Sequence, residues 1–62
     1  MNRLPSNLVG REVILIMNSG DELDGKCTMA SENYITLQHC SWEYTFAAEA
    51  IAAISVNREG KA

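Results

Sequence analysis

The segment that decides the fold is VILIMNSGDELDGKCTM, residues 13–29. Its first part, Val13–Met17, is an unbroken apolar run, which is typical of a strand covered on both faces. Asn18–Asp21 holds one glycine among three polar residues, the composition of a hairpin turn. From Glu22 onward apolar and polar residues alternate, as in a strand buried on one face only. The segment therefore predicts two paired strands of a small curved sheet.

The second strand, expected over residues 22–30, has a glycine on the side that is predicted to be buried. That side consists of Leu23, Gly25, Cys27 and Met29. A glycine there permits a sharp bend or a close approach of neighbouring backbone. Because a small barrel requires strong bending, this glycine indicates that the sheet closes into a barrel.

Three more strands are predicted from alternating or β-branched residues, at residues 34–39, 42–46 and 51–56. Residues 47–50 are expected to form one helical turn before the last strand. Because alanine is the best helix former, a helix across 46–54 is the competing interpretation of this alanine-rich part of the chain.

The N-terminal region is predicted to contain a short helix over residues 5–9. Proline suits the first position of a helix and glycine its end, and Pro5 and Gly10 hold these places. A short helix followed by five strands, the second of them bent, is the element order of an SH3-like or OB-like barrel. The sequence thus predicts one mostly β domain spanning residues 1–62.

Composition restricts the class of protein further. A chain of 62 residues buries only about 60% of its unfolded surface, so its own core is marginal. Since 47% of the residues are hydrophobic, self-association is expected to supply further burial. Cys27 and Cys40 allow at most one disulfide, no signal peptide is predicted, and no apolar run reaches about 18 residues. A cytoplasmic protein without membrane contact is expected.

The distribution of charge limits the ligands. The net charge is −3, and between residues 12 and 57 Lys26 is the only cation beside seven carboxylates. Such a body repels phosphate. A nucleic-acid site would therefore rely on arginines near the ends, above all Arg3 and Arg11, or would recognise bases instead of the backbone. Ordinary surface charge is the other interpretation of these two arginines.

A resemblance to a known family rests on Leu8–Val13 before the first strand, Ser19 and Gly20 in the turn, and Gly25 in the second strand. These residues resemble the Sm-like proteins, which include Hfq, over about residues 8–56. The resemblance implies an N-terminal helix, a strongly bent five-stranded antiparallel barrel and homo-oligomeric rings, here of five to seven subunits. In such rings the fourth strand of one subunit pairs with the fifth strand of the next.

Aromatic residues are concentrated on the predicted fourth strand. Trp42, Tyr44 and Phe46 share one face because they lie two residues apart. Such residues stack on bases, fill a core, or concentrate at subunit interfaces, and the lack of nearby cations favours core or interface. With Ile54 and Val56 of the last strand, they are the expected residues of the subunit interface that the resemblance implies.

The resemblance also implies single-stranded RNA as a ligand. Where the family has an Asp, a base-stacking residue and an Asn after the second strand, this chain has Ser31, Asn33 and Ile35. Ala48 and Glu49 occupy the loop where the family has a basic residue. The RNA contacts expected here are Arg3, Arg11, Asn33 and Tyr34.

The resemblance therefore predicts a homo-oligomeric ring protein that binds single-stranded RNA or acts as an RNA-chaperone-type module. Because the RNA-binding positions differ from those of the family, a ring that acts as a structural or protein-interaction scaffold is the alternative. A barrel that recognises a peptide without forming a ring is the third hypothesis.

No enzyme, metal or cofactor site is expected. His39 and Cys40 are adjacent, so as strand residues they point to opposite faces, and no third residue completes a nucleophilic arrangement. With Cys27 they offer three of the four ligands of a zinc site, without paired spacing. The acidic residues lack the pattern of a calcium loop; they are Asp21, Glu22, Asp24 and Glu32.

Overall fold

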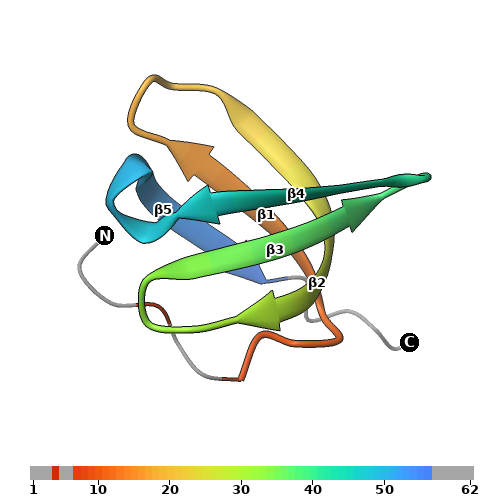
Figure 1. Cartoon of the computed structure of the whole chain (residues 1–62). Coiled ribbons are helices and arrows are strands. Elements are labelled where there is room, and N and C mark those ends of the chain that lie inside the picture. The colour runs from red at the N-terminus through yellow and green to blue at the C-terminus, as the bar shows by residue number, and fades with distance from the viewer. Residues whose placement is uncertain (1–3, 5–6, 57–62) are drawn as a thin grey trace.

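The computed structural model describes Leu4 and residues 7–56, and within them it contains five strands and one short 3-10 helix. These elements are β1 (Glu12–Met17), β2 (Glu22–Ala30), β3 (Tyr34–His39), β4 (Trp42–Ala47), η1 (Ala48–Ala50) and β5 (Ile51–Val56) (Figure 1). The strands form one antiparallel sheet in the order β4-β3-β2-β1-β5. The predicted mostly β, five-stranded architecture is confirmed. This part of the chain has no helix of the length and apolarity that crossing a membrane requires.

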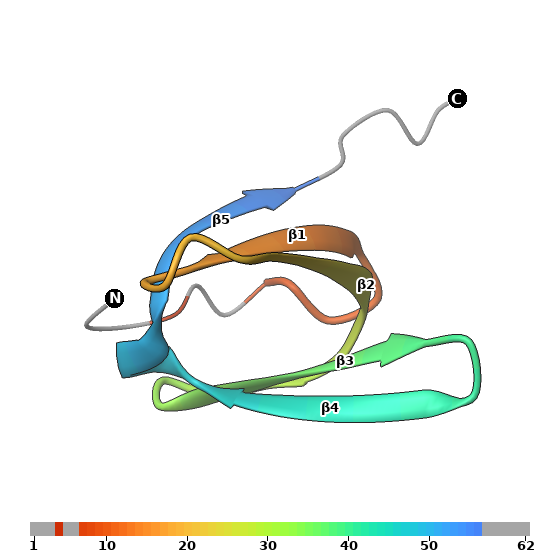
Figure 2. The ribbon, with the colours of Figure 1, turned by 90° about the horizontal axis from the view of Figure 1, so that it is seen from above.

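The bend of the sheet lies in β2. Its first half pairs with β1 and its second half with β3, and Lys26 faces Glu12 on one side and Gln38 on the other. Seen from above, β1 and β5 lie in one layer, β3 and β4 in a second, and β2 passes between them (Figure 2). A Cβ atom on Gly25 would lie 2.8 Å from the carbonyl oxygen of Gln38. The close backbone approach predicted at this glycine is confirmed.

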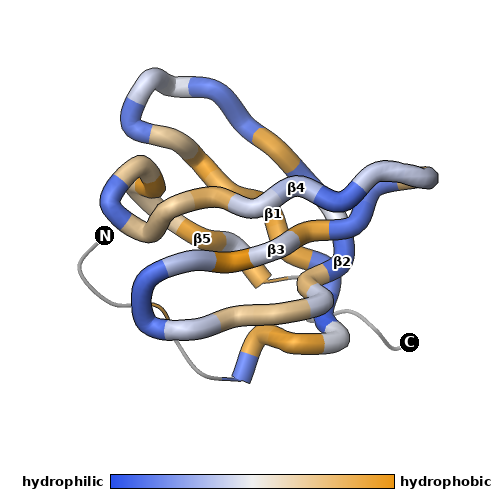
Figure 3. The backbone as a smooth tube through the Cα atoms, viewed as in Figure 1, coloured by the Kyte–Doolittle hydropathy of each residue, from blue (hydrophilic) through white to orange (hydrophobic). Residues whose placement is uncertain are grey.

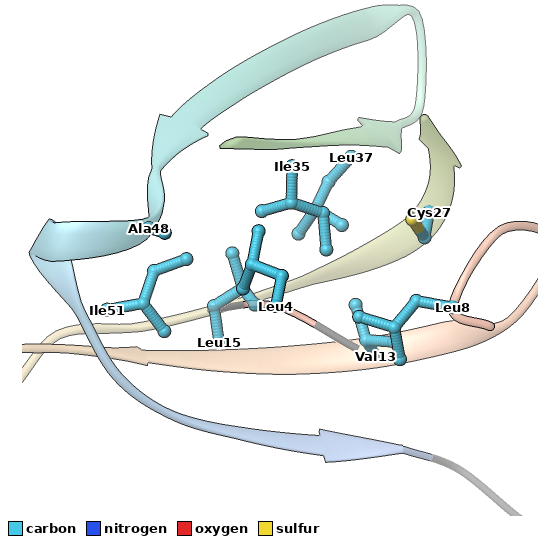
Figure 4. Packing of buried hydrophobic residues seen from close by; sticks show 9 residues of the cluster. All are labelled: Leu4, Leu8, Val13, Leu15, Cys27, Ile35, Leu37, Ala48 and Ile51. Carbon is cyan, nitrogen blue, oxygen red and sulfur yellow. The ribbon is translucent and has the colours of Figure 1, made fainter. Parts of the chain in front are cut away.

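The core fills the space between the two layers. Side chains of the N-terminal segment, four of the strands and η1 meet there (Figure 4). They are Leu4, Leu8, Val13, Leu15, Cys27, Ile35, Leu37, Ala48 and Ile51. Figure 3 shows that hydrophilic residues gather instead at the turns on either side of β2. Seven of the core side chains are at most 2% exposed, and burial of a leucine-sized side chain contributes about 1.5–3 kcal/mol.

The alternation of β2 changes sides along the strand. Gly25 and Cys27 are buried as predicted, but Met29 is 53% exposed. The pairing with β3 shifts between Cys27 and Met29, so Thr28 is an extra residue that turns the following side chains over. The prediction that Met29 is buried was therefore wrong. Leu23, also predicted to be inward, lines an open groove instead of the core.

The N-terminal helix predicted over residues 5–9 is not formed in the described part of the segment; Pro5 and Ser6 lie outside the described residues. The backbone is instead bonded to β2: the Gly10 amide donates to the Cys27 carbonyl at 2.7 Å, and the Cys27 amide donates to the Arg11 carbonyl at 2.9 Å. These bonds extend the β1–β2 ladder to the point where the predicted helix would end. Over residues 7–9, the described part of the predicted range, the helix prediction was wrong.

The alanine-rich segment follows the first of its two interpretations. Residues 48–50 form the single helical turn η1, and residues 51–56 form β5, as predicted. The competing helix over 46–54 does not form because Phe46 pairs with Ile35 and Ile54 pairs with Leu15 in the sheet. Strand pairing here outweighs the helix propensity of alanine.

Candidate functional site

The sheet ends in two edges that could accept another chain. β4 has only β3 beside it, and β5 has only β1, so the order β4-β3-β2-β1-β5 leaves one open side at each end of the described sheet. An edge strand is a template for pairing with a further strand. The two edges are different in sequence, which allows one copy's β4 to meet another copy's β5.

The β4 edge carries a row of three aromatic rings. Tyr44 pairs with Leu37 and Phe46 pairs with Ile35, and because paired residues share a face, the rings lie on the inner face of the sheet. The Trp42 and Tyr44 centroids are 6.4 Å apart at 22°, and those of Tyr44 and Phe46 are 6.2 Å apart at 31°. The shared face predicted for the three residues is confirmed.

These rings do not fill the core, although they face the same side as core residues. Trp42 is 65% exposed, Tyr44 is 46% exposed, and Phe46 is half-buried. Next to them lies a largely apolar groove of about 390 Å³, lined by Leu23, Asp24, Leu37, His39, Tyr44 and Phe46. Of the three interpretations drawn from the sequence, filling the core is thus excluded for Trp42 and Tyr44, and base stacking and the subunit interface remain predictions.

The β5 edge is lined by smaller side chains. Ile54 pairs with Leu15 and Val56 pairs with Val13, both of which are buried, so Ile54 and Val56 also lie on the inner face. Both are half-buried. The opposite face of β5 bears alanine and serine. Each edge therefore has a partly covered apolar row on the same face of the sheet, bulky on β4 and small on β5.

Three turns meet at one end of the sheet, on the same side in Figure 1. The Asn18 amide and its Nδ2 donate to the carbonyls of Ala50 and Glu49, at 2.9 and 2.8 Å, and the Ala48 amide donates to the Asn33 carbonyl at 2.8 Å. This end, which we call the loop end, thus joins residues 18–21, 31–33 and 48–50. Its exposed charges are acidic: Asp21, Glu32 and Glu49.

Two of the predicted RNA contacts lie at the loop end. Asn33 and Tyr34 are both exposed, and the Ser31 hydroxyl accepts hydrogen bonds from their amides at 3.2 and 3.3 Å. This serine closes the β2–β3 turn and so holds the two residues together. Arg11 is exposed but lies elsewhere, beside Cys27 in the middle of β2. Arg3 lies outside the described residues.

From the sequence, Asn18 was identified only as a turn residue, whereas the structure shows a longer-range role. Asparagine in a turn is expected to bond to nearby backbone, and that was the only signal in the sequence. Its side chain instead reaches the carbonyl of Glu49, 31 residues away. A contact at that separation depends on how β4 and β5 return to the first hairpin, which local sequence does not specify.

The cysteines and histidine are dispersed. Cys27 and Cys40 are both free, the first buried and the second exposed, and burial raises the pKa of the Cys27 thiol. Cys40 has φ +57 in the turn between β3 and β4. Among residues 4 and 7–56, no three His, Cys, Asp or Glu side chains lie close enough to hold a metal ion.

Comparison with known protein families, with curated proteins and with solved structures found no match to this chain.

Proposed function

We propose that this chain is a subunit of an Sm-like homo-oligomeric ring, a small SH3-like barrel whose β4 pairs with β5 of the next subunit. The observation that carries the proposal is the pair of open edges, each with an apolar row on the inner face that a single chain leaves partly uncovered. Contact between two different surfaces of identical subunits generates a ring when the rotation closes. Five to seven subunits are expected.

The two edges are suited to each other in length and shape. β4 and β5 each have six residues, enough for a continuous antiparallel ladder between copies. Bulky rings of Trp42, Tyr44 and Phe46 would lie beside the smaller Ile54 and Val56, so that large and small side chains interdigitate. Aromatic residues each bury about 150–250 Å² in cores and interfaces, which makes this row the main source of affinity in the proposed contact.

We propose single-stranded RNA as the ligand of the ring. The support is the exposed Tyr34 ring next to the exposed side chain of Asn33. Aromatic rings stack on unpaired bases, and side-chain amides bond to base edges. In a ring this pair repeats once per subunit, which adds avidity to a weak single contact. Arg3 and Arg11 are the proposed phosphate contacts.

A ring that serves as a scaffold without RNA is the second candidate. It is favoured by the carboxylates of Asp21, Glu32 and Glu49 at the loop end. Repeated around a ring, these charges form an acidic surface that repels the phosphate backbone. The two candidates share the assembly and differ in what the loop end binds.

Native mass spectrometry and light scattering test the assembly. The expected mass is five to seven times the 6.8 kDa of one chain. A particle of 6.8 kDa at micromolar concentration would contradict the ring, and with it both candidates.

Fluorescence anisotropy with short A-rich, U-rich and mixed RNA at two salt concentrations tests the ligand. Binding that weakens in Tyr34→Ala, with the ring intact, is expected. Replacing Arg11 by Ala should flatten the salt dependence, because fewer counterions are released on binding. No binding at ~10 µM protein in low salt would favour the scaffold. Many proteins bind nucleic acid non-specifically at this concentration.

A further inference from the structure

The two edge strands are joined directly by η1. β4 ends at Ala47 and β5 begins at Ile51, so three residues carry the chain from one edge of the sheet to the other. Figure 2 shows η1 at the corner where the layer of β4 passes into the layer of β5. η1 therefore connects the two edges directly, and its orientation is tied to the angle between them.

Hydrogen bonds from two other turns hold η1 in place. On the β4 side, the Ala48 amide donates to the Asn33 carbonyl at 2.8 Å. On the β5 side, Asn18 donates twice, from Nδ2 to the Glu49 carbonyl at 2.8 Å and from its amide to the Ala50 carbonyl at 2.9 Å. Ala48 and Ile51 are buried at the two ends of η1. Asn18 thus attaches the β1–β2 turn to the end of η1 from which β5 leaves.

We infer that Asn18 sets the angle between β4 and β5 and so determines how many subunits close the ring; this rests on the proposed function. In a closed ring each subunit is rotated relative to the next by a full turn divided by the number of subunits. This rotation differs by only about 9° between a hexamer and a heptamer. A small tilt of η1 is enough to change the number. The Asn18 side chain is the part of this attachment that a substitution can remove while the backbone bond to Ala50 stays.

Two substitutions remove the side-chain donor in different ways. Asn18→Ala takes away the bond to Glu49 and leaves space. Asn18→Asp keeps the shape and the preference for turns, but it places a carboxylate oxygen against the Glu49 carbonyl oxygen, where both atoms are acceptors. Ser19→Ala is the matched control, since the Ser19 hydroxyl bonds to Asp21 within the same turn at 3.1 Å.

Native mass spectrometry of the full chain and its three variants is the test, with circular dichroism to show that each variant is folded. The unmodified chain and Ser19→Ala are expected to give one and the same subunit number. Asn18→Ala and Asn18→Asp are expected to give closed rings of a different number, or a mixture of two numbers.

The inference is overturned if both Asn18 variants keep the subunit number of the unmodified chain. It is also overturned if they give only folded monomers or unfolded chains, because Asn18 then supports subunit association or folding stability and not the angle. If one variant fails to fold, the other decides. An unmodified chain that is monomeric contradicts the proposed function itself, and this separates the two failures.

Discussion

Replacement of Gly25 by alanine is the most direct test of the bend in β2. The added Cβ would lie 2.8 Å from the Gln38 carbonyl oxygen, and 3.4 Å from both the carbonyl carbon of Gln38 and the Leu37 Cβ. Contacts of Cβ with backbone at less than about 3 Å are not tolerated in close-packed interiors, and the oxygen belongs to the β3 backbone. The β2 and β3 backbones must therefore separate by several tenths of an ångström where they pair.

The magnitude follows from two opposing effects. Overpacking costs about 1–3 kcal/mol. Alanine restricts the unfolded chain more than glycine does, which stabilises the folded state by about 0.4–1 kcal/mol. We expect a net loss of about 1–2 kcal/mol, out of a total of about 3–9 kcal/mol for a domain of 62 residues.

Urea unfolding followed by circular dichroism measures this loss. For an m-value near 1 kcal/mol/M, the midpoint should fall by about 1–2 M with the slope unchanged. Amide exchange should accelerate in the β2–β3 ladder near Gln38 and less in the β1–β5 ladder, since the clash is local. Gly20→Ala is the comparison: no atom lies within 4 Å of its Cβ, so its cost comes only from φ +98. A Gly25→Ala protein as stable as the unmodified one would refute the reasoning.

Three further predictions concern other parts of the fold. Trp42→Ala should weaken the proposed subunit contact by about 2–4 kcal/mol. In light scattering, the variant ring should then dissociate at a higher protein concentration than the unmodified ring. An unchanged dissociation concentration would place Trp42 outside the interface. Because burial raises the pKa of the Cys27 thiol, this thiol ionises first in the unfolded chain, so its contribution to stability is constant below about pH 8.5 and falls above it. A thiol reagent should modify Cys40 quickly and Cys27 only with unfolding, and equal rates would contradict the burial of Cys27. Thr36→Val removes the 2.9 Å hydroxyl pair with Thr45 and should lower the unfolding free energy by about 1 kcal/mol; no change in thermal unfolding would show that water replaces that bond without loss.

The two candidate functions make opposite demands on the loop end. RNA binding requires that stacking on Tyr34 outweigh repulsion from Glu32 and Glu49, whereas a scaffold requires no contact with phosphate. Charge reversal separates them: Glu49→Lys should raise RNA affinity and steepen its salt dependence if RNA is the ligand.

The sequence by itself determined the elements that depend on local chemistry. The apolar run of Val13–Met17, the polar turn with Gly20 and the alternation after Glu22 led to β1, its hairpin and β2, because strand period and turn composition are properties of neighbouring residues. The later strands followed from the same rules. Gly25 marked the bend because its missing side chain has a steric consequence wherever the strand is placed.

Tertiary structure decided everything that depends on pairing partners. The extra residue at Thr28 turns Met29 outward because of how β2 pairs with β3, and alternation alone carries no sign of it. The described part of the N-terminal segment contains no helix, and its bonds to Cys27 of β2 depend on a partner far along the chain.

The same division holds for the candidate site. The shared face of Trp42, Tyr44 and Phe46 was determined by their spacing, but their exposure was decided by the position of β4 at the edge of the sheet. Asn18 looked like a turn residue, and only the return of η1 to the first hairpin brings it to Glu49. Local patterns specify which face a side chain takes, whereas strand order and long-range contacts specify what covers it.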